Sequence, residues 1–82
     1  MDNRVATLGI IVEDENSIVK LNDILHEYRD IIISRMGVPY DKRNINIICL
    51  IVDGNSDRIN SLSGKLGATQ GLASKVCYFQ LG

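Results

Sequence analysis

Two continuous runs of apolar, largely β-branched residues constrain the fold of this chain most strongly. They span residues 5–12 (VATLGIIV) and residues 45–52 (INIICLIV), and an acidic residue directly follows each run. Alternate side chains of a strand point to opposite faces of a sheet, and in both runs the two alternating sets are largely apolar. The pattern therefore predicts two strands that lie in the middle of a sheet.

Two other stretches have the three- and four-residue spacing of apolar side chains that is typical of amphipathic helices. They span about residues 15–29 and about residues 56–66, and Gly67 follows the second, where a left-handed glycine commonly ends a helix. The candidate N-caps are Asp14 or Asn16 for the first helix and Asn55 or Ser56 for the second. The predicted buried stripes are Ile18, Leu21, Ile24, Leu25 and Tyr28 in the first helix and Ile59, Leu62 and Leu66 in the second.

Two further strands complete the predicted fold. Residues 30–36, which include three consecutive isoleucines, form one, and residues 76–81 (VCYFQL) form the other. Gly37, Pro39 and Asp41 predict the connection after the first of these strands, and the small residues 68–73 predict a turn before the second. The order strand, helix, strand, strand, helix, strand is that of the α+β ferredoxin-like fold, βαββαβ. We expect residues 1–82 to form one such domain, a four-stranded antiparallel sheet with both helices on one face.

Size and charge limit the class of protein. A domain of 82 residues has a small core, and such domains commonly need a staple, a metal or a partner. Nine Lys and Arg against ten Asp and Glu give a net charge of −1 with no basic run, so we expect no direct nucleic-acid binding. The N-terminal residues do not resemble a signal peptide, and the longest apolar run is too short to cross a membrane. Two cysteines are too few for a disulfide framework, and we expect a cytoplasmic protein with reduced thiols.

Two helices can cover only one face of the predicted sheet. We assign the bulkier alternating sets of the central strands to the helix side, although the reverse assignment is compatible with the pattern. An apolar face then remains uncovered, and on a small domain such a face commonly marks an interface. We therefore expect a homo-oligomer, a dimer or a tetramer, whose interface is formed by Val5, Thr7, Gly9, Ile11, Ile47, Cys49 and Ile51.

The sequence offers no recognisable catalytic or metal-binding motif. His26 is the only histidine, and it has no paired nucleophile in an obvious pattern. Cys49 and Cys77 lie on strands that the first strand should separate, which places them beyond disulfide reach. Arg35 near the uncovered face could bind an anion or a partner's carboxylate, or could be a solvated charge on an edge strand. We expect no enzyme, no metal and no cofactor.

Five short segments resemble a known family when they are taken together. They are residues 10–14 (IIVED), 25–32 (LHEYRDII), 35–39 (RMGVP), 50–54 (LIVDG) and 63–67 (SGKLG). In this order they resemble the iron-only hydrogenase system regulator family of small bacterial proteins. The resemblance implies a fold similar to ACT domains and to the C-terminal domain of the nickel-responsive repressor, which assembles through its sheet domains. A single histidine does not supply the His-rich nickel site of that repressor.

Two functional hypotheses follow from the open face and the resemblance. The first is an ACT-like regulatory module that senses a small-molecule effector at subunit seams. Its expected ligand-binding residues are Glu13, Asp14, Asn16, Arg35 and Gly37. The alternative is a protein-interaction subunit without a ligand, which modulates a hydrogenase-maturation enzyme or a transcription factor. An enzyme is disfavoured because no acid–base pair stands at a recognisable spacing.

Overall fold

The computed structural model describes residues 3–80 and confirms the ferredoxin-like order of elements. The strands are β1 (Asn3–Val12), β2 (Ile32–Tyr40), β3 (Ile45–Asn55) and β4 (Leu72–Phe79), and the helices are α1 (Ile18–Glu27) and α2 (Ser56–Gly67). Single 3-10 turns, Glu15–Ser17 and Asp41–Arg43, precede α1 and connect β2 to β3. Neither helix in the described residues is long and apolar enough to cross a membrane.

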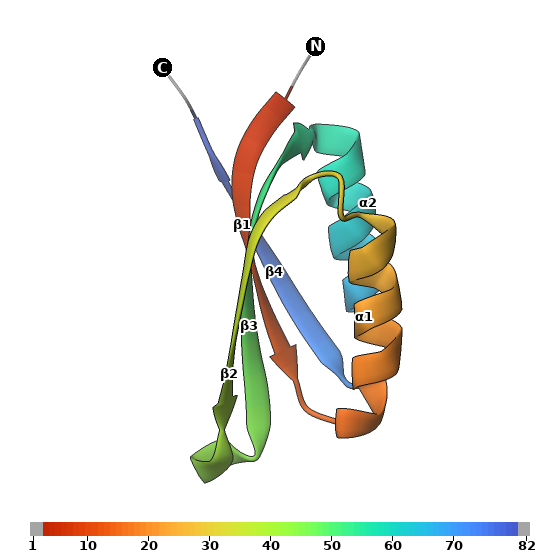
Figure 1. The fold of residues 1–82 in the computed structure, drawn as a ribbon, viewed down its shortest axis with the longest axis vertical. Helices are drawn as coiled ribbons and strands as arrows, with labels where there is room; N and C mark the ends of the chain where they lie inside the picture. The colour runs from red at the N-terminus through yellow and green to blue at the C-terminus, as the bar shows by residue number, and fades with distance from the viewer. Residues whose placement is uncertain (1–2, 81–82) are drawn as a thin grey trace.

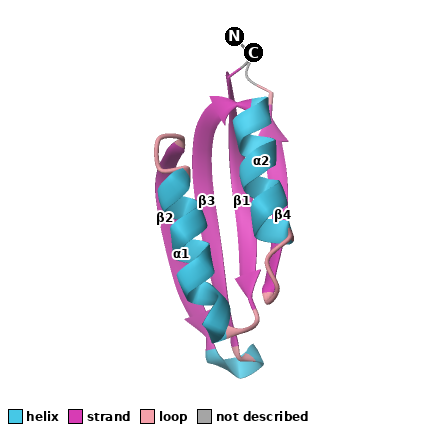
Figure 2. Ribbon diagram, turned by 90° about the vertical axis from the view of Figure 1, so that its right-hand side faces the viewer, coloured by secondary structure: helices cyan, strands magenta, loops and turns pink. Residues whose placement is uncertain are grey.

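The four strands form one antiparallel sheet in the order β2-β3-β1-β4. The two apolar runs are thus the central strands, as predicted. Both helices lie on the same face of this sheet, and the opposite face carries no element of the described chain (Figure 1, Figure 2). The molecule therefore has two layers, helices on a sheet.

The core lies between the helices and the sheet. The bulkier alternating sets of the central strands point toward the helices and are buried, as predicted. The stripes of α1 and α2 pack on them. The buried side chains include Leu8, Ile10, Val12, Ile48, Leu50 and Val52 from the sheet and Leu21, Ile24, Leu25, Ile59, Leu62 and Leu66 from the helices.

The first helix is shorter than the sequence predicts at both ends. Asp14 accepts a hydrogen bond from the backbone N–H of Asn16 at 3.0 Å, and the chain makes a 3-10 turn before α1 begins at Ile18. The hydroxyl of Ser17 donates to the carbonyl of Gln70 at 2.7 Å, which ties this turn to the loop before β4. This long-range contact, which no local pattern reveals, fixes the entry into α1.

The second strand is longer than predicted, and Gly37 and Pro39 lie within it rather than in a connection. Proline has no N–H to donate, but β2 is an edge strand and one of its sides has no strand partner. The connection is the 3-10 turn that follows, and it ends at Asn44, whose φ of 55° is left-handed. Asparagine tolerates this conformation better than most residues.

Two predictions for the C-terminal half, the start of the last strand and the position of the left-handed glycine, are wrong. Strand β4 begins at Leu72, four residues before the predicted start, because residues 72–76 pair with β1; the predicted end at Leu81 lies outside the described residues. Gly67 is the last residue of α2 and is not left-handed. The left-handed glycine is Gly71, with φ of 87°, directly before β4.

Candidate functional site

The uncovered face of the sheet is the first candidate site. Val5, Thr7, Gly9 and Ile11 alternate along β1 with side chains that are buried under the helices. Their partners across the β1–β3 pair are Asp53, Ile51, Cys49 and Ile47. All seven residues that the sequence assigns to an oligomer interface therefore lie on this face, which we call the open face.

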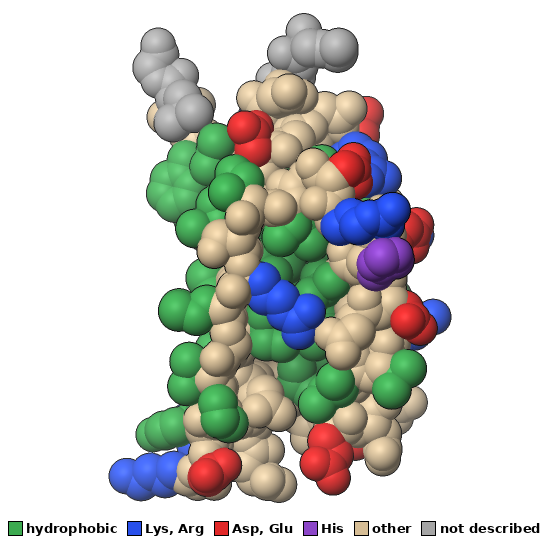
Figure 3. Space-filling view, in the orientation of Figure 1, with side chains coloured by type: hydrophobic (Ala, Val, Ile, Leu, Met, Phe, Trp, Pro, Cys, Tyr) green, Lys and Arg blue, Asp and Glu red, His purple; other side chains and the backbone are tan. Residues whose placement is uncertain are grey.

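The outer strands extend the open face with side chains that the predicted interface does not include. Met36 pairs with Cys49, and Val38 pairs with Ile47, so both point away from the helices. Met36 is 62% exposed and Phe79, on β4, is 47% exposed. Val38 was missed because it lies beyond the predicted end of β2. Met36 and Phe79 lie within the predicted strands and were missed because only the two central strands were considered for the interface. Figure 3 shows hydrophobic side chains along the margin of the molecule that faces away from the helices.

Few charges interrupt the open face within the described strands. Lys75 is the neighbour of Gly9 across the β1–β4 pair, and Asp53 lies at one end of the face beside Val5. Cys49 is half-buried and Cys77 is exposed, and both thiols are free. Strand β1 lies between them, as the sequence predicts.

A groove between α1 and β2 is the second candidate site. It consists of two hollows of about 180 Å³ and 350 Å³, and Arg35 lines both of them. Arg35 and Gly37 point to the helix side because their partners on β3 are Leu50 and Ile48. Arg35 Nη2 donates to Asn22 Oδ1 on α1 at 3.0 Å, so this side chain bridges the groove. We call the two hollows together the α1–β2 groove.

The structure separates the five residues that the sequence assigns to ligand binding. Arg35 and Gly37 line the α1–β2 groove. Glu13 and Asp14 line a different hollow of about 420 Å³, between the end of β1 and the connection from β2 to β3, together with Asp41. Asn16 lines neither hollow. Within residues 3–80, no three His, Cys, Asp or Glu side chains are placed to hold a metal ion.

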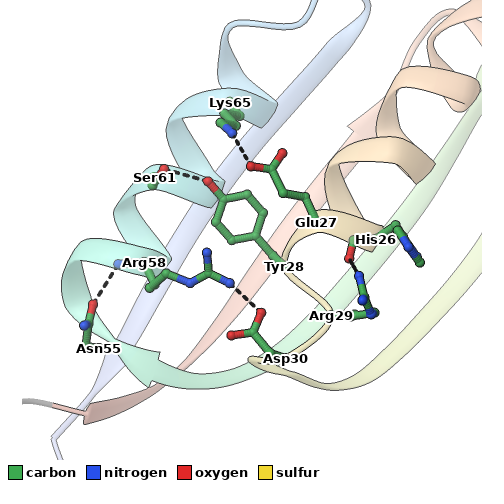
Figure 4. A network of polar contacts seen from close by, with 9 residues as sticks. All are labelled: His26, Glu27, Tyr28, Arg29, Asp30, Asn55, Arg58, Ser61 and Lys65. Carbon is green, nitrogen blue, oxygen red and sulfur yellow. Dashed lines mark hydrogen bonds and ion pairs between the residues drawn. The ribbon is translucent and has the colours of Figure 1, made fainter.

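A polar network joins the two helices on the outer side of the domain (Figure 4). The hydroxyls of Tyr28 and Ser61 share a hydrogen bond of 2.6 Å, and the Tyr28 side chain is buried. Lys65 Nζ donates to Glu27 Oε2 at 2.7 Å, and this contact raises the pKa of Lys65 above its ordinary value. Both pairs connect α1 or its C-cap to α2.

A second ion pair completes this network. Arg58 pairs with Asp30, and its guanidinium lies 4.6 Å from the centre of the Tyr28 ring. Exposed ion pairs contribute little to stability, so the network orients the helices more than it stabilises them. All of its charges have partners, and we assign it a structural role. It was missed because its residues lie far apart in the sequence.

Comparison with protein families gives a match over residues 4–76 to the family described as "TM1266-like: Iron-only hydrogenase system regulator, putative". Among solved structures, the uncharacterized protein TM1266 from Thermotoga maritima has a TM-score of 0.91 and 32% identity, over 96% of this chain and 100% of that chain. No curated protein matches the chain significantly.

Two more distant structures share the fold. The ACT domain from GTP pyrophosphokinase of Chlorobium tepidum has a TM-score of 0.71 and 23% identity, over 99% of this chain and 91% of that chain. A formyltetrahydrofolate deformylase from Pseudomonas putida KT2440 has a TM-score of 0.62 and 14% identity, over 89% of this chain and 28% of that chain. The fold is therefore ACT-like, as the resemblance implied. With the match over residues 4–76, the chain belongs to the TM1266-like family of iron-only hydrogenase system regulators.

Proposed function

We propose that this protein is a regulatory module of an iron-only hydrogenase system that acts as a homo-oligomer and senses a small molecule. The observation that carries the proposal is the open face, which is mostly apolar, is interrupted by few charges and faces away from the helices. A solvated antiparallel face normally carries mostly polar side chains, whereas most of the side chains on this face are apolar. The occupant we propose is the same face of a second copy.

The size of the open face suits such a contact. Four strands spaced by about 4.8 Å and a length of about eight residues cover roughly 500 Å². Two copies packed face to face would then bury roughly 1,000 Å² in total, which is the lower bound for a specific protein–protein interface. Small residues at its centre favour close approach of the second sheet, and a Cβ added at Gly9 would meet no atom within 4 Å.

The sensing half of the proposal is supported by the family and by the groove. A regulator needs an input, and the α1–β2 groove offers a hollow next to the sheet that contains an arginine without an ion pair in the described chain. The same strand, β2, also carries part of the open face. A ligand that moves β2 could therefore change how two copies pack.

Oligomeric state tests the first half of the proposal. Light scattering coupled to size-exclusion chromatography at micromolar concentration should give a mass of at least two chains. Ile47→Lys places a charge on the open face, where Ile47 is 38% exposed, and should give a monomer with an unchanged circular-dichroism spectrum. Val19→Lys is the matched control because Val19 is 72% exposed on α1, and this variant should remain oligomeric. A wild-type monomer would overturn the proposal.

A thermal-shift screen tests the second half. Amino acids, organic acids, nucleotides and metal ions should be added singly to the wild-type protein, and at least one of them should raise the melting temperature. If no compound stabilises an oligomeric protein, the alternative of a protein-interaction subunit without a ligand is favoured.

A further inference from the structure

We infer that the α1–β2 groove binds a small oxyanion with a short apolar body, most favourably a branched carboxylate without an ammonium group. This inference rests on the proposed sensing function and names the ligand class. Arg35 would hold the anionic end and the smaller hollow would hold the apolar end. The inference follows from the lining of the two hollows.

The smaller hollow accommodates the apolar end of the ligand. Most of its lining is apolar, and its volume of about 180 Å³ is close to that of a cavity of about 150 Å³ that binds benzene. The ligand body should therefore contain about four to six carbon atoms. Figure 3 shows hydrophobic side chains along the floor of the space between β2 and α1. The apolar side chains that line it include Ile18, Leu21, Pro39 and Ile48.

The anionic end is selected by the charge of the groove. Arg35 lines both hollows, and the larger hollow is also lined by Arg29 and His26. No Asp or Glu side chain lines either hollow. The guanidinium of Arg35 donates one hydrogen bond, to the neutral amide of Asn22, and forms no ion pair within residues 3–80. Since a guanidinium presents a fork of five N–H donors, it can still bind an oxyanion with two parallel hydrogen bonds.

The same charge disfavours a zwitterion. An α-ammonium group needs an acceptor, preferably a carboxylate, and here it would lie near two arginines instead. We therefore expect 4-methylpentanoate to bind more tightly than leucine, which has the same carbon skeleton and an added ammonium group. This preference separates the inferred site from a general amino-acid site.

Gly37 keeps the smaller hollow open. A Cβ added at this residue would lie 3.7 Å from Ile48 Cγ1, which is an ordinary contact, and Gly37 does not have a left-handed φ. Valine should therefore fit the strand and fill part of the hollow without a clash with the backbone. Gly37→Val should block the apolar end of the ligand while the protein stays folded.

The test is isothermal titration of the wild-type protein with five probes: 4-methylpentanoate, leucine, 4-methylpentan-1-ol, acetate and isobutyl phosphate. The carboxylate or the phosphate ester should bind at least about tenfold more tightly than the alcohol, because a charge-assisted pair is absent from the alcohol complex. Acetate, which has no apolar body, should bind weakly. The ratio of the two anions identifies whether the natural ligand carries a carboxylate or a phosphate.

Variants then assign the binding to the groove. Arg35→Ala and Gly37→Val should each weaken binding of the better anion about tenfold or more, and Arg35→Lys should lie between Arg35→Ala and wild type. Arg43→Ala and Gly64→Ala are matched controls, because both residues are exposed and neither lines the groove. Circular dichroism checks that each variant is folded.

The inference is overturned if no probe binds, if the alcohol or leucine binds as tightly as 4-methylpentanoate and isobutyl phosphate, or if Arg35→Ala and Gly37→Val leave binding unchanged. These results differ from a failure of the proposed function. If another compound stabilises the protein and its effect survives both substitutions, sensing stands and the groove is not the site. If no compound of any class stabilises the protein, sensing also fails.

Discussion

Gly54 lies buried in β3 beneath Ile31, and this contact allows a quantitative prediction. A Cβ added at Gly54 would lie 2.7 Å from Ile31 Cγ2 and 3.1 Å from Ile31 Cβ. Ile31 is β-branched, so both of its atoms are close to the backbone and have little freedom to move aside. We expect Gly54→Ala to lower the free energy of unfolding by roughly 1–3 kcal/mol, the usual cost of overpacking in a core.

A double-mutant cycle isolates this contact. Ile31→Ala alone should cost about 2–4 kcal/mol, because Ile31 is only 7% exposed and its removal leaves a cavity. In the double variant, the new methyl group at residue 54 occupies part of that cavity and no longer clashes. The double variant should therefore lose less stability than the two single variants together, by about 1 kcal/mol or more.

Urea unfolding followed by circular dichroism measures all four proteins of the cycle. One fixed protein concentration is needed, because the stability of an oligomer depends on concentration. Gly37→Ala is the control for a glycine-to-alanine change in a strand without a clash, since its added Cβ would make an ordinary contact at 3.7 Å. Additive losses within about 0.5 kcal/mol, or a Gly54→Ala variant as stable as wild type, would refute the steric argument.

Three other predictions concern single residues. Gly71→Ala should cost more than about 1–2 kcal/mol, because the φ of 87° is left-handed and the added Cβ would lie against Ser17 and 2.9 Å from Asp14 Cβ. Gly64→Ala, on an exposed turn of α2 with open space around it, should instead stabilise the protein by about 0.5–1 kcal/mol, and the same urea-unfolding assay measures both variants. Lys65→Gln should lower the melting temperature at pH 9, because Glu27 raises the pKa of Lys65 above 10.5 and the folded state therefore holds this proton more tightly. When the melting temperatures of both proteins are measured as a function of pH, the difference between wild type and Lys65→Gln should shrink as the pH rises above 10.5. A difference that persists at higher pH would contradict the role of the Lys65 charge.

The two central strands and the two helices could be predicted because their sequence patterns are local. Two apolar runs and two helical stripes specify the order of elements, and the bulkier set on each central strand identifies the buried face. The bounds of the edge strands could not be predicted in the same way. Gly37 and Pro39 are typical of turns, but an edge strand tolerates both because one of its sides needs no ladder of hydrogen bonds.

The positions of special glycines depend on distant residues and were mispredicted for that reason. Gly67 stands where a helix commonly ends in a left-handed residue, yet the chain turns at Gly71 instead. That turn lies against Ser17, whose hydroxyl donates to the Gln70 carbonyl 53 residues later in the chain. The apolar run predicts a strand that ends at Val52, but β3 continues to Asn55, and the absence of a side chain at Gly54 leaves room for Ile31.

The candidate sites were predictable to different degrees, and strand β2 explains the difference. The residues of the open face on β1 and β3 follow from alternation alone. The residues predicted to bind a ligand were grouped by proximity to predicted loops, and the structure divides them. Once β2 extends through Tyr40, its alternation places Arg35 and Gly37 in the α1–β2 groove and Met36 and Val38 on the open face. The two proposed surfaces are thus opposite sides of one edge strand. If both are occupied, thermodynamic linkage requires that a ligand which changes association has its own affinity changed by association, and by the same factor.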